Sequence, residues 1–381
     1  MLPEKDRLWE IATLFLKLGV IAFGGPAAHI AMMEEEVVSK RRWMSRQHFL
    51  DLVGATNLIP GPNSTEMTMH CGHERAGWKG LFVAGLCFIF PAVVLTGLLA
   101  YFYVEYGTVP QVEPFLYGIK PAVLAVILSA IYKLGRKALK NWQLAIIGVL
   151  VITASLLGMN EITAILLAGL AGMLWLGLPR AFHGNRANSP GLIPWLLTGA
   201  GKALAAGVTN SKLFLVFLKV GAVLFGSGYV LVAYLDAELV EKLGWLTRAE
   251  LLDAIAIGQF TPGPVLSTAT FIGYQINGVQ GAVVATLGIF LPSFFFVLLL
   301  NPLVPRLRKS ALAAGFLDAV NIAAVGVMLA VTFRLGEAIL VDWKAWLIAL
   351  LGMGYVLGLK KANSLVLVAG GALLGFLLWQ L

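Results

Sequence analysis

Two stretches of the sequence carry the same Pro-Gly-Pro break. One reads Asn57-Leu58-Ile59-Pro60-Gly61-Pro62-Asn63-Ser64-Thr65, and the other reads Gln259-Phe260-Thr261-Pro262-Gly263-Pro264-Val265-Leu266-Ser267-Thr268. The glycine allows close backbone approach, and the second proline suits the first turn of a new helix, where its missing N–H costs nothing. Each stretch therefore predicts a helix that is broken and restarted.

The two breaks belong to a tandem duplication. Phe15-Leu16-Lys17-Leu18-Gly19 returns as Phe217-Leu218-Lys219-Val220-Gly221, at an offset of 202 residues. Residues 15–70 and 217–272 share 18 identities in 56 positions, which chance does not supply. A second pair of breaks, Phe23-Gly24-Gly25-Pro26 and Phe225-Gly226-Ser227-Gly228, has the same offset. We therefore divide the chain into a first repeat (1–178), a hydrophilic linker (179–212) and a second repeat (213–381).

The composition is that of an integral membrane protein. Of 381 residues, 59% are hydrophobic and 13% are charged, whereas about 45–50% and 25% are usual in soluble domains. A bilayer core takes about 20 apolar residues as a helix. The candidate spans are 9–31, 80–104, 115–132, 142–158, 161–178, 213–233, 281–301, 316–332, 344–359 and 363–380. The stretches 45–72 and 247–274 are too interrupted for ordinary spans, and we predict that they are re-entrant hairpins.

The net charge of +8 comes from short basic clusters between apolar runs, which indicate membrane topology and not a nucleic-acid partner. If each hairpin leaves on the side it entered, 19 basic residues face the cytoplasm, and five, including Lys5 and Arg7, face the other side. Five spans per half is an odd number, so the second half is inverted and both chain ends lie outside. The predicted fold is an all-α polytopic membrane protein with two inverted-topology repeats, about ten spanning helices and two re-entrant helical hairpins.

Paired breaks at matching positions of inverted repeats indicate a transport site. The helix that follows each break points N–H groups and a partial positive charge toward the membrane midplane, which favours an anion. The residues that we predict to bind substrate are Lys17, Gly24, Gly25, Asn57, Pro60, Gly61, Pro62, Asn63, Ser64, Thr65, Lys219, Gly226, Ser227, Pro262, Gly263, Pro264, Ser267 and Thr268.

Charged side chains at membrane depth are costly and usually functional. Lys17 and Lys219 occupy equivalent positions, and they either balance the charge of a dianion or extend to the membrane surface. Glu66 follows the first break and has Thr268 as its counterpart. Three roles remain open for Glu66: proton coupling, a salt bridge with Lys17, and a structural hydrogen bond.

The positions of three more charged residues predict roles for them. Asp51 and Asp253 stand at the start of the two hairpins, as helix caps or as gate ion pairs with Arg46 and Arg248. Lys120 precedes a proline and brings one more positive charge to the cavity.

Several classes of protein are excluded. The sequence contains no nucleophile motif, P-loop or nucleotide fingerprint, and its histidines lack a partner set for zinc. We therefore expect neither an enzyme nor an ATP-driven pump, and no cofactor or metal. The expected partners are a small oxyanion and membrane lipids, and a homodimer stays open.

The breaks Phe23–Pro26 with Pro60–Pro62, and Phe225–Gly228 with Pro262–Pro264, resemble those of the chromate ion transporter family, in its two-domain long-chain form. The resemblance covers about residues 10–360. It implies chromate efflux from the bacterial cytoplasm across the inner membrane, driven by the proton gradient, with sulfate as the natural mimic. The second copy departs from the first because Asn63 is replaced by Val265 and Glu66 by Thr268, so the two half-sites should contribute unequally.

Alternatives remain beside this reading. One is a transporter that takes up sulfate or carries another oxyanion. Another is a lipid-phosphate flippase, which would want arginines at depth, and this sequence places none there.

Overall fold

The computed structural model describes residues 3–22, 26–56, 59–106, 113–177, 179, 208–225, 228–300, 310–359 and 363–380, and every regular element in these ranges is helical. The elements up to residue 177, here the first half, are α1 (Glu4–Ile21), α2 (Pro26–Met33), η1 (Glu34–Lys40), α3 (Arg46–Thr56), α4 (Asn63–Tyr106), α5 (Glu113–Ala138), α6 (Trp142–Leu156), α7 (Glu161–Gly172) and η2 (Met173–Gly177). Those from residue 208, the second half, are α9 (Asn210–Val223), η3 (Gly228–Val230), α10 (Leu231–Leu235), η4 (Asp236–Lys242), α11 (Arg248–Phe260), η5 (Val265–Ser267), α12 (Thr268–Leu300), α14 (Ala311–Ile339), α15 (Trp343–Gly358) and α16 (Ser364–Trp379).

The chain is an all-α membrane protein. Four of the described helices are long and apolar enough to cross a bilayer: α4, α5, α12 with the turn before it, and α14. Shorter apolar helices follow them in each half, at Trp142–Leu156, Glu161–Gly177, Trp343–Gly358 and Ser364–Trp379. Large apolar side chains lie exposed on the outer surface, including Phe90 at 62% and Leu350 at 63%. Such a surface is suited to lipid and not to water.

The long helices join the two halves. Helices α6 and α7 of the first half pack on α14 of the second, while α15 and α16 pack on α5 of the first. Helices α4 and α12 also pack against each other, and the Phe82 and Phe294 rings stack with centroids 5.3 Å apart. The hydrophobic core is therefore shared between the halves.

The prediction of one continuous spanning helix over residues 9–31 is wrong. Helix α1 ends at Ile21, and α2 starts at Pro26 and runs back beside it. Lys17 Nζ lies 3.4 Å from Glu36 Oε1, and the Trp43 indole N–H donates to Glu10 at 3.2 Å, so contacts pair residues in antiparallel order. The reason is local, because a proline at the first position of α2 fixes a new helix start.

The second half repeats this departure from the expected span 213–233. Helix α9 ends at Val223, and the chain returns through η3, α10 and η4. The Tyr234 hydroxyl donates to the Val223 carbonyl at 2.8 Å, and Lys219 pairs with Glu238. Each half therefore contains a helical hairpin at each of its two breaks. From the sequence we predict only the hairpin at the Pro-Gly-Pro break.

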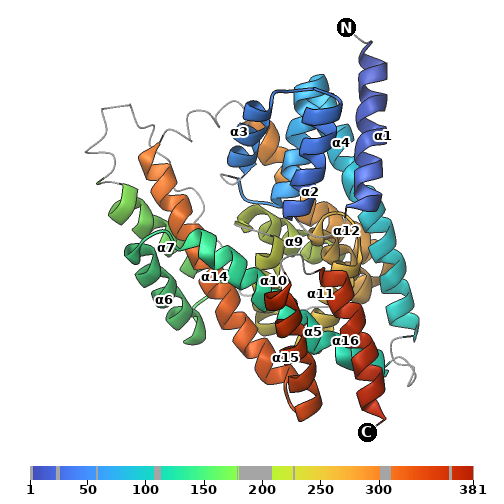
Figure 1. Ribbon diagram of the computed structural model, residues 1–381, viewed down its shortest axis with the longest axis vertical. Helices are drawn as coiled ribbons and strands as arrows, with labels where there is room; N and C mark the ends of the chain where they lie inside the picture. The colour runs from blue at the N-terminus through green and yellow to red at the C-terminus, as the bar shows by residue number, and fades with distance from the viewer. Residues whose placement is uncertain are drawn as a thin grey trace.

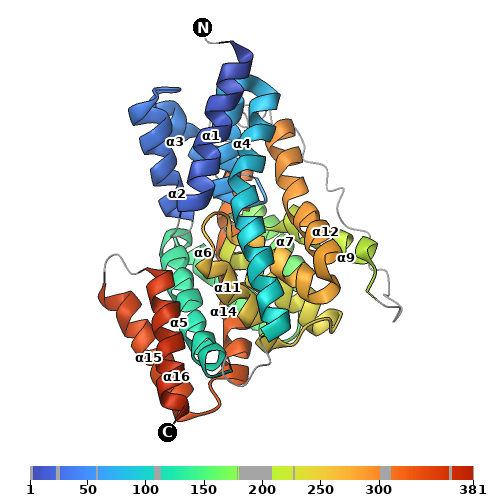
Figure 2. The ribbon, with the colours of Figure 1, turned by 90° about the vertical axis from the view of Figure 1, so that its right-hand side faces the viewer.

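The end of α1 at Ile21 also corrects the position of the N-terminal end. Lys79 Nζ lies 2.8 Å from Glu4, and Arg7 donates to the Arg75 carbonyl at 3.3 Å. Lys5 and Arg7 therefore lie on the same face as Arg75, and not on the opposite face as we had expected. The N- and C-terminal ends lie at opposite ends of the longest dimension (Figures 1 and 2).

Helix α4 is two helices joined by a sharp reversal. Ala76 and Gly77 have non-helical backbone angles, and Gly77 has a φ of 61°. The reversal brings Gly72 and Gly80 so close that a Cβ on either would overlap the other's carbonyl oxygen. Asn277 and Gly278 form the equivalent reversal in α12. The short first part of α4, together with α3, forms the hairpin that the Pro-Gly-Pro sequence predicts.

This contact generates a prediction about stability. Gly80→Ala should lower the thermal unfolding temperature more than Gly77→Ala. The methyl at position 80 meets backbone that no rotamer change can move. Position 77 has nothing within 4 Å and suffers only the strain of its backbone angles (φ 61°, ψ −152°), about 1–3 kcal/mol. Gly354→Ala, in open space on α15, is the control, and it should be neutral or stabilising by up to about 1 kcal/mol. Thermal unfolding in detergent measures all three, and equal losses at positions 77 and 80 would contradict the packing.

Candidate functional site

The four breaks meet at the interface between the halves. The Gly61 N–H donates to the Leu224 carbonyl at 2.6 Å, and the Gly263 N–H donates to the Ala22 carbonyl at 2.9 Å. Leu224 and Ala22 are the residues at which α9 and α1 end. Each Pro-Gly-Pro tip is therefore hydrogen-bonded to the end of the first long helix of the opposite half. The two bonds are related by the same offset of 202 residues that relates the sequences.

Glycine is required at both tips. Gly61 has a φ of 144° and Gly263 a φ of 90°, values that side chains with a Cβ rarely adopt. Space is also lacking at the first tip, where a Cβ on Gly61 would overlap Glu66 Oε1 and lie 2.6 Å from Ser293 Oγ. A Cβ on Gly263 would meet only the Ala92 methyl, at 3.1 Å, and more distant carbonyls. The two tips therefore differ in the chemistry that faces the glycine.

At the first tip, buried polar atoms lack partners. Within the described ranges, neither carboxylate oxygen of Glu66 has a hydrogen-bond partner, and neither has the hydroxyl of Thr65 or of Ser293. All three side chains are fully buried. Buried polar groups in proteins are nearly always hydrogen-bonded, so an unsatisfied cluster calls for a ligand, water or ion. The pairing of Glu66 with Lys17 that the sequence left open is wrong, because Lys17 pairs with Glu36.

At the second tip, the hydroxyls bond within the protein. The Thr268 hydroxyl donates to the Val265 carbonyl at 2.8 Å, and Ser267 Oγ accepts from Thr96 at 3.2 Å. The Thr261 hydroxyl donates to the Gly258 carbonyl at 2.9 Å. This tip therefore has less capacity to bind a ligand than the first.

The helix starts differ in the same way. Helix α4 begins at Asn63, and the N–H groups of Thr65 and Glu66 donate to the Pro62 carbonyl at 2.8 and 3.1 Å. After Pro264 the chain forms only a 3₁₀ turn, η5, and α12 begins at Thr268. The Thr268 side chain binds the carbonyl of Val265, and such local bonds compete with regular helix. The expected α-helix start directly after both breaks is thus present only after the first.

The two intramembrane lysines have carboxylate partners. Glu36, which pairs with Lys17, also lies 3.2 Å from Lys40 and 3.4 Å from Arg41. In the second half Glu238 pairs with Lys219 and, at 3.3 Å, with Lys242. These ion pairs hold the two arms of each first hairpin together. Charge balance of an anion by Lys17 and Lys219 stays a prediction.

Five of the predicted site residues lie outside the described ranges. They are Gly24, Gly25, Asn57, Gly226 and Ser227. Of the described ones, Pro60, Gly61, Pro62, Ser64 and Thr65 are buried at the first tip, with Asn63 half-buried.

Sequence reasoning missed Ser293, which comes from the other half of the chain. It follows Pro292, the partner of Pro91 in the repeat, and its own counterpart is Ala92. Ser293 could have been found by searching the two repeats for positions at which a polar residue in one replaces an apolar residue in the other.

A second polar cluster joins the halves away from the tips. Asp253 on α11 accepts from the Tyr103 hydroxyl at 2.8 Å, and Lys120 Nζ lies 3.4 Å from the same carboxylate oxygen. Asp253 is 4% exposed and Lys120 24%. Asp253 is therefore neither a cap nor a partner of Arg248, because Thr247 caps α11 and Arg248 pairs with Asp236 and Glu241.

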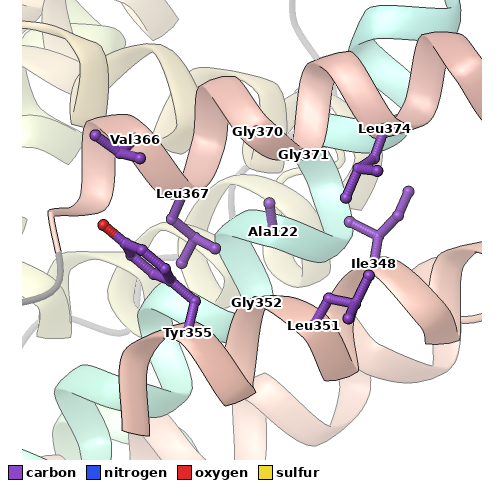
Figure 3. A pocket seen from close by; sticks show the side chains of 10 residues that line it. All are labelled: Ala122, Ile348, Leu351, Gly352, Tyr355, Val366, Leu367, Gly370, Gly371 and Leu374. Atoms are coloured by element: carbon purple, nitrogen blue, oxygen red, sulfur yellow. The ribbon is translucent and has the colours of Figure 1, made fainter. Parts of the chain in front are cut away.

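A cavity of about 230 Å³ lies between α5, α15 and α16. Figure 3 shows its lining, which includes Ala122, Ile348, Leu351 and Leu367, with the Tyr355 hydroxyl at one edge. No charged side chain lines this cavity, so it is no site for an oxyanion.

The cluster around Asp253 generates the second prediction. Lys120→Met should lower stability by about 3 kcal/mol, because it leaves a buried carboxylate without its cation. Lys120→Met combined with Asp253→Asn should recover much of that loss, since the charge is then removed. Thermal unfolding of the purified protein measures this, and a fully stable Lys120→Met variant would contradict the ion pair.

Comparisons with known proteins place this geometry in a family. The model of the chromate transporter family matches the chain twice, over residues 9–173 and 211–376. The chromate transport protein of Cupriavidus metallidurans is 29% identical over 98% of this chain and 94% of its own length. A probable chromate transport protein of Synechococcus elongatus is 29% identical over 98% of this chain and 96% of its own. The chromate transport protein of Pseudomonas aeruginosa is 30% identical, with 97% and 92% covered. No solved structure matches the chain.

Proposed function

This chain belongs to the chromate transporter family, as the resemblance of its breaks predicted, and from this premise we propose that it is a secondary active transporter that exports chromate across the bacterial inner membrane, driven by the proton gradient. The observation that carries the proposal is the first Pro-Gly-Pro tip, where a helix starts inside the protein beside buried polar atoms without partners. Such a helix start binds anions through its N–H groups and its dipole.

We propose further that the two repeats, 1–178 and 213–381, have inverted topology. The reciprocal bonds of Gly61 and Gly263 support a two-fold relation between the halves. The antiparallel course of α5 and α14 also supports it, since Gly135 faces Val325 and Gly336 faces Leu124. The linker 179–212 lies largely outside the described ranges.

The anion binds where α4 begins. The N–H groups of its first turn, with Asn63, Ser64 and Thr65, supply hydrogen bonds to a tetrahedral oxyanion. A carboxylate beside a dianion would repel it, so Glu66 is protonated while the anion is bound. For export, this proton has to stay on Glu66 and not leave with the anion. The membrane potential, worth about 2.3 kcal/mol per charge and 100 mV, expels a dianion from a cytoplasm that is negative inside.

Flux in proteoliposomes tests this proposal. Chromate flux should rise when a membrane potential or a pH gradient is imposed, and should exceed that of molybdate and phosphate, with sulfate as the main competitor. Ser64→Ala or Thr65→Val should weaken the apparent affinity about tenfold, because each removes a hydrogen bond to a charged group. Gradient-independent chromate flux would contradict the energy coupling, and transport of sulfate without chromate would favour the alternative substrate.

The topology has a test of its own. In a variant without Cys71 and Cys87, a cysteine at the exposed position Asp6 should react with maleimide only from the cytoplasm, and one at the exposed position Gln380 only from outside. The reason is that the N-terminal end lies beside Arg75 and Lys79, on the basic face, while the C-terminal end lies at the opposite end of the molecule. Labelling of both positions from the same side would contradict this arrangement.

A further inference from the structure

Two buried side chains from different halves meet at the first tip. Glu66 belongs to the first turn of α4, and Ser293 belongs to α12 of the second half. Glu66 Oε1 and Ser293 Oγ are the two atoms nearest to a Cβ built on Gly61, so both lie against the same face of this glycine. Both residues are 0% exposed. We infer that Glu66 and Ser293 form a two-donor notch at Gly61 that holds one oxygen of the transported oxyanion, an inference that rests on the proposed function.

The first reason is that these polar atoms have no other partner in the described part of the chain. The two carboxyl oxygens of Glu66 and the hydroxyl of Ser293 have no hydrogen-bond partner among the described residues. A buried carboxyl without a counter-charge is held in its neutral form, because an isolated carboxylate is very costly at low dielectric. Neutral Glu66 and Ser293 each present an O–H donor, and an oxyanion oxygen is the acceptor that suits two such donors.

The second reason is the nearby helix start. Helix α4 has 44 residues including its reversal, and its first N–H groups belong to Asn63 and Ser64, since the N–H groups of Thr65 and Glu66 donate to the Pro62 carbonyl. An anion that accepts hydrogen bonds from these groups also lies beside Gly61, because Glu66 is on the same first turn. The notch and the helix start therefore form a single site that is incomplete without the second half.

The third reason is that the duplicated tip lacks the same pair. The counterparts of Gly61, Glu66 and Ser293 are Gly263, Thr268 and Ala92. The Thr268 hydroxyl is already bonded to the Val265 carbonyl, and Ala92 offers only a methyl group. Duplication alone would have produced two equivalent sites, but the polar groups have been kept at one. The transporter therefore binds one anion, off the axis that relates its halves.

The matched variants are Ser293→Ala and Ala92→Ser, which make the reverse change at equivalent positions. Binding of chromate, sulfate and molybdate to the purified protein is measured by calorimetry, with thermal unfolding as the control for folding. Ser293→Ala should weaken anion binding about tenfold at unchanged unfolding temperature, because one hydrogen bond to a charged group is lost. Ala92→Ser should bind like the wild type. The double variant should stay as weak as Ser293→Ala, because a hydroxyl at the second tip has no neighbouring acid.

Ser293→Cys keeps the size of the side chain and weakens the donor, so it should give a smaller loss, and it serves if Ser293→Ala fails to fold. Wild-type affinity in both Ser293 variants would overturn the notch, even if chromate flux is normal and the proposed function stands. If the wild type binds sulfate or molybdate and not chromate, and Ser293→Ala weakens that binding, the notch stands and the proposed substrate is wrong. Recovery of affinity in the double variant would also overturn the one-sided site.

Discussion

Irregular backbone inside a membrane needs hydrogen-bond partners that lipid cannot supply. This chain interrupts its helices at four places, and it meets the requirement by placing the breaks against one another. The bonds from Gly61 to Leu224 and from Gly263 to Ala22 each join a Pro-Gly-Pro tip of one half to a helix end of the other. Neither half can satisfy its own tip. The shared core, in which α5 carries α15 and α16 while α14 carries α6 and α7, keeps these partners in register.

The duplicated frame is symmetric, but the groups within it are not. The glycines with positive φ, the reversals in α4 and α12 and the ion pairs of Lys17 and Lys219 occur in both halves. Of the two tips, by contrast, only the first has unsatisfied buried polar atoms among the described residues, and there Glu66 faces Gly61. Backbone geometry is thus kept twice because both tips must close the interface, whereas side-chain chemistry is free to differ.

The sequence was sufficient for the features that depend on local residue type. Pro-Gly-Pro marked two breaks, the apolar composition marked the membrane class, and the differences between repeats marked the first tip as the richer one. It failed at residues 9–31, because an apolar run of sufficient length satisfies the rule for a span whether or not the chain turns in the middle. The partners of Lys17 and Asp253 could not be predicted, since Glu36 and Lys120 reach them only after the hairpins fold.

The charge arrangement suits a site that must release its ligand. The two lysines expected to neutralise a dianion are already paired with Glu36 and Glu238. In the proposed site, helix N–H groups and neutral hydroxyls bind the anion without a fixed opposite charge. Full ion pairing at low dielectric would hold a dianion tightly and slow its exit, because the attraction rises steeply as the dielectric constant falls. Stabilisation by dipoles is weaker, and for a transporter weaker binding is an advantage, since each cycle has to end with release.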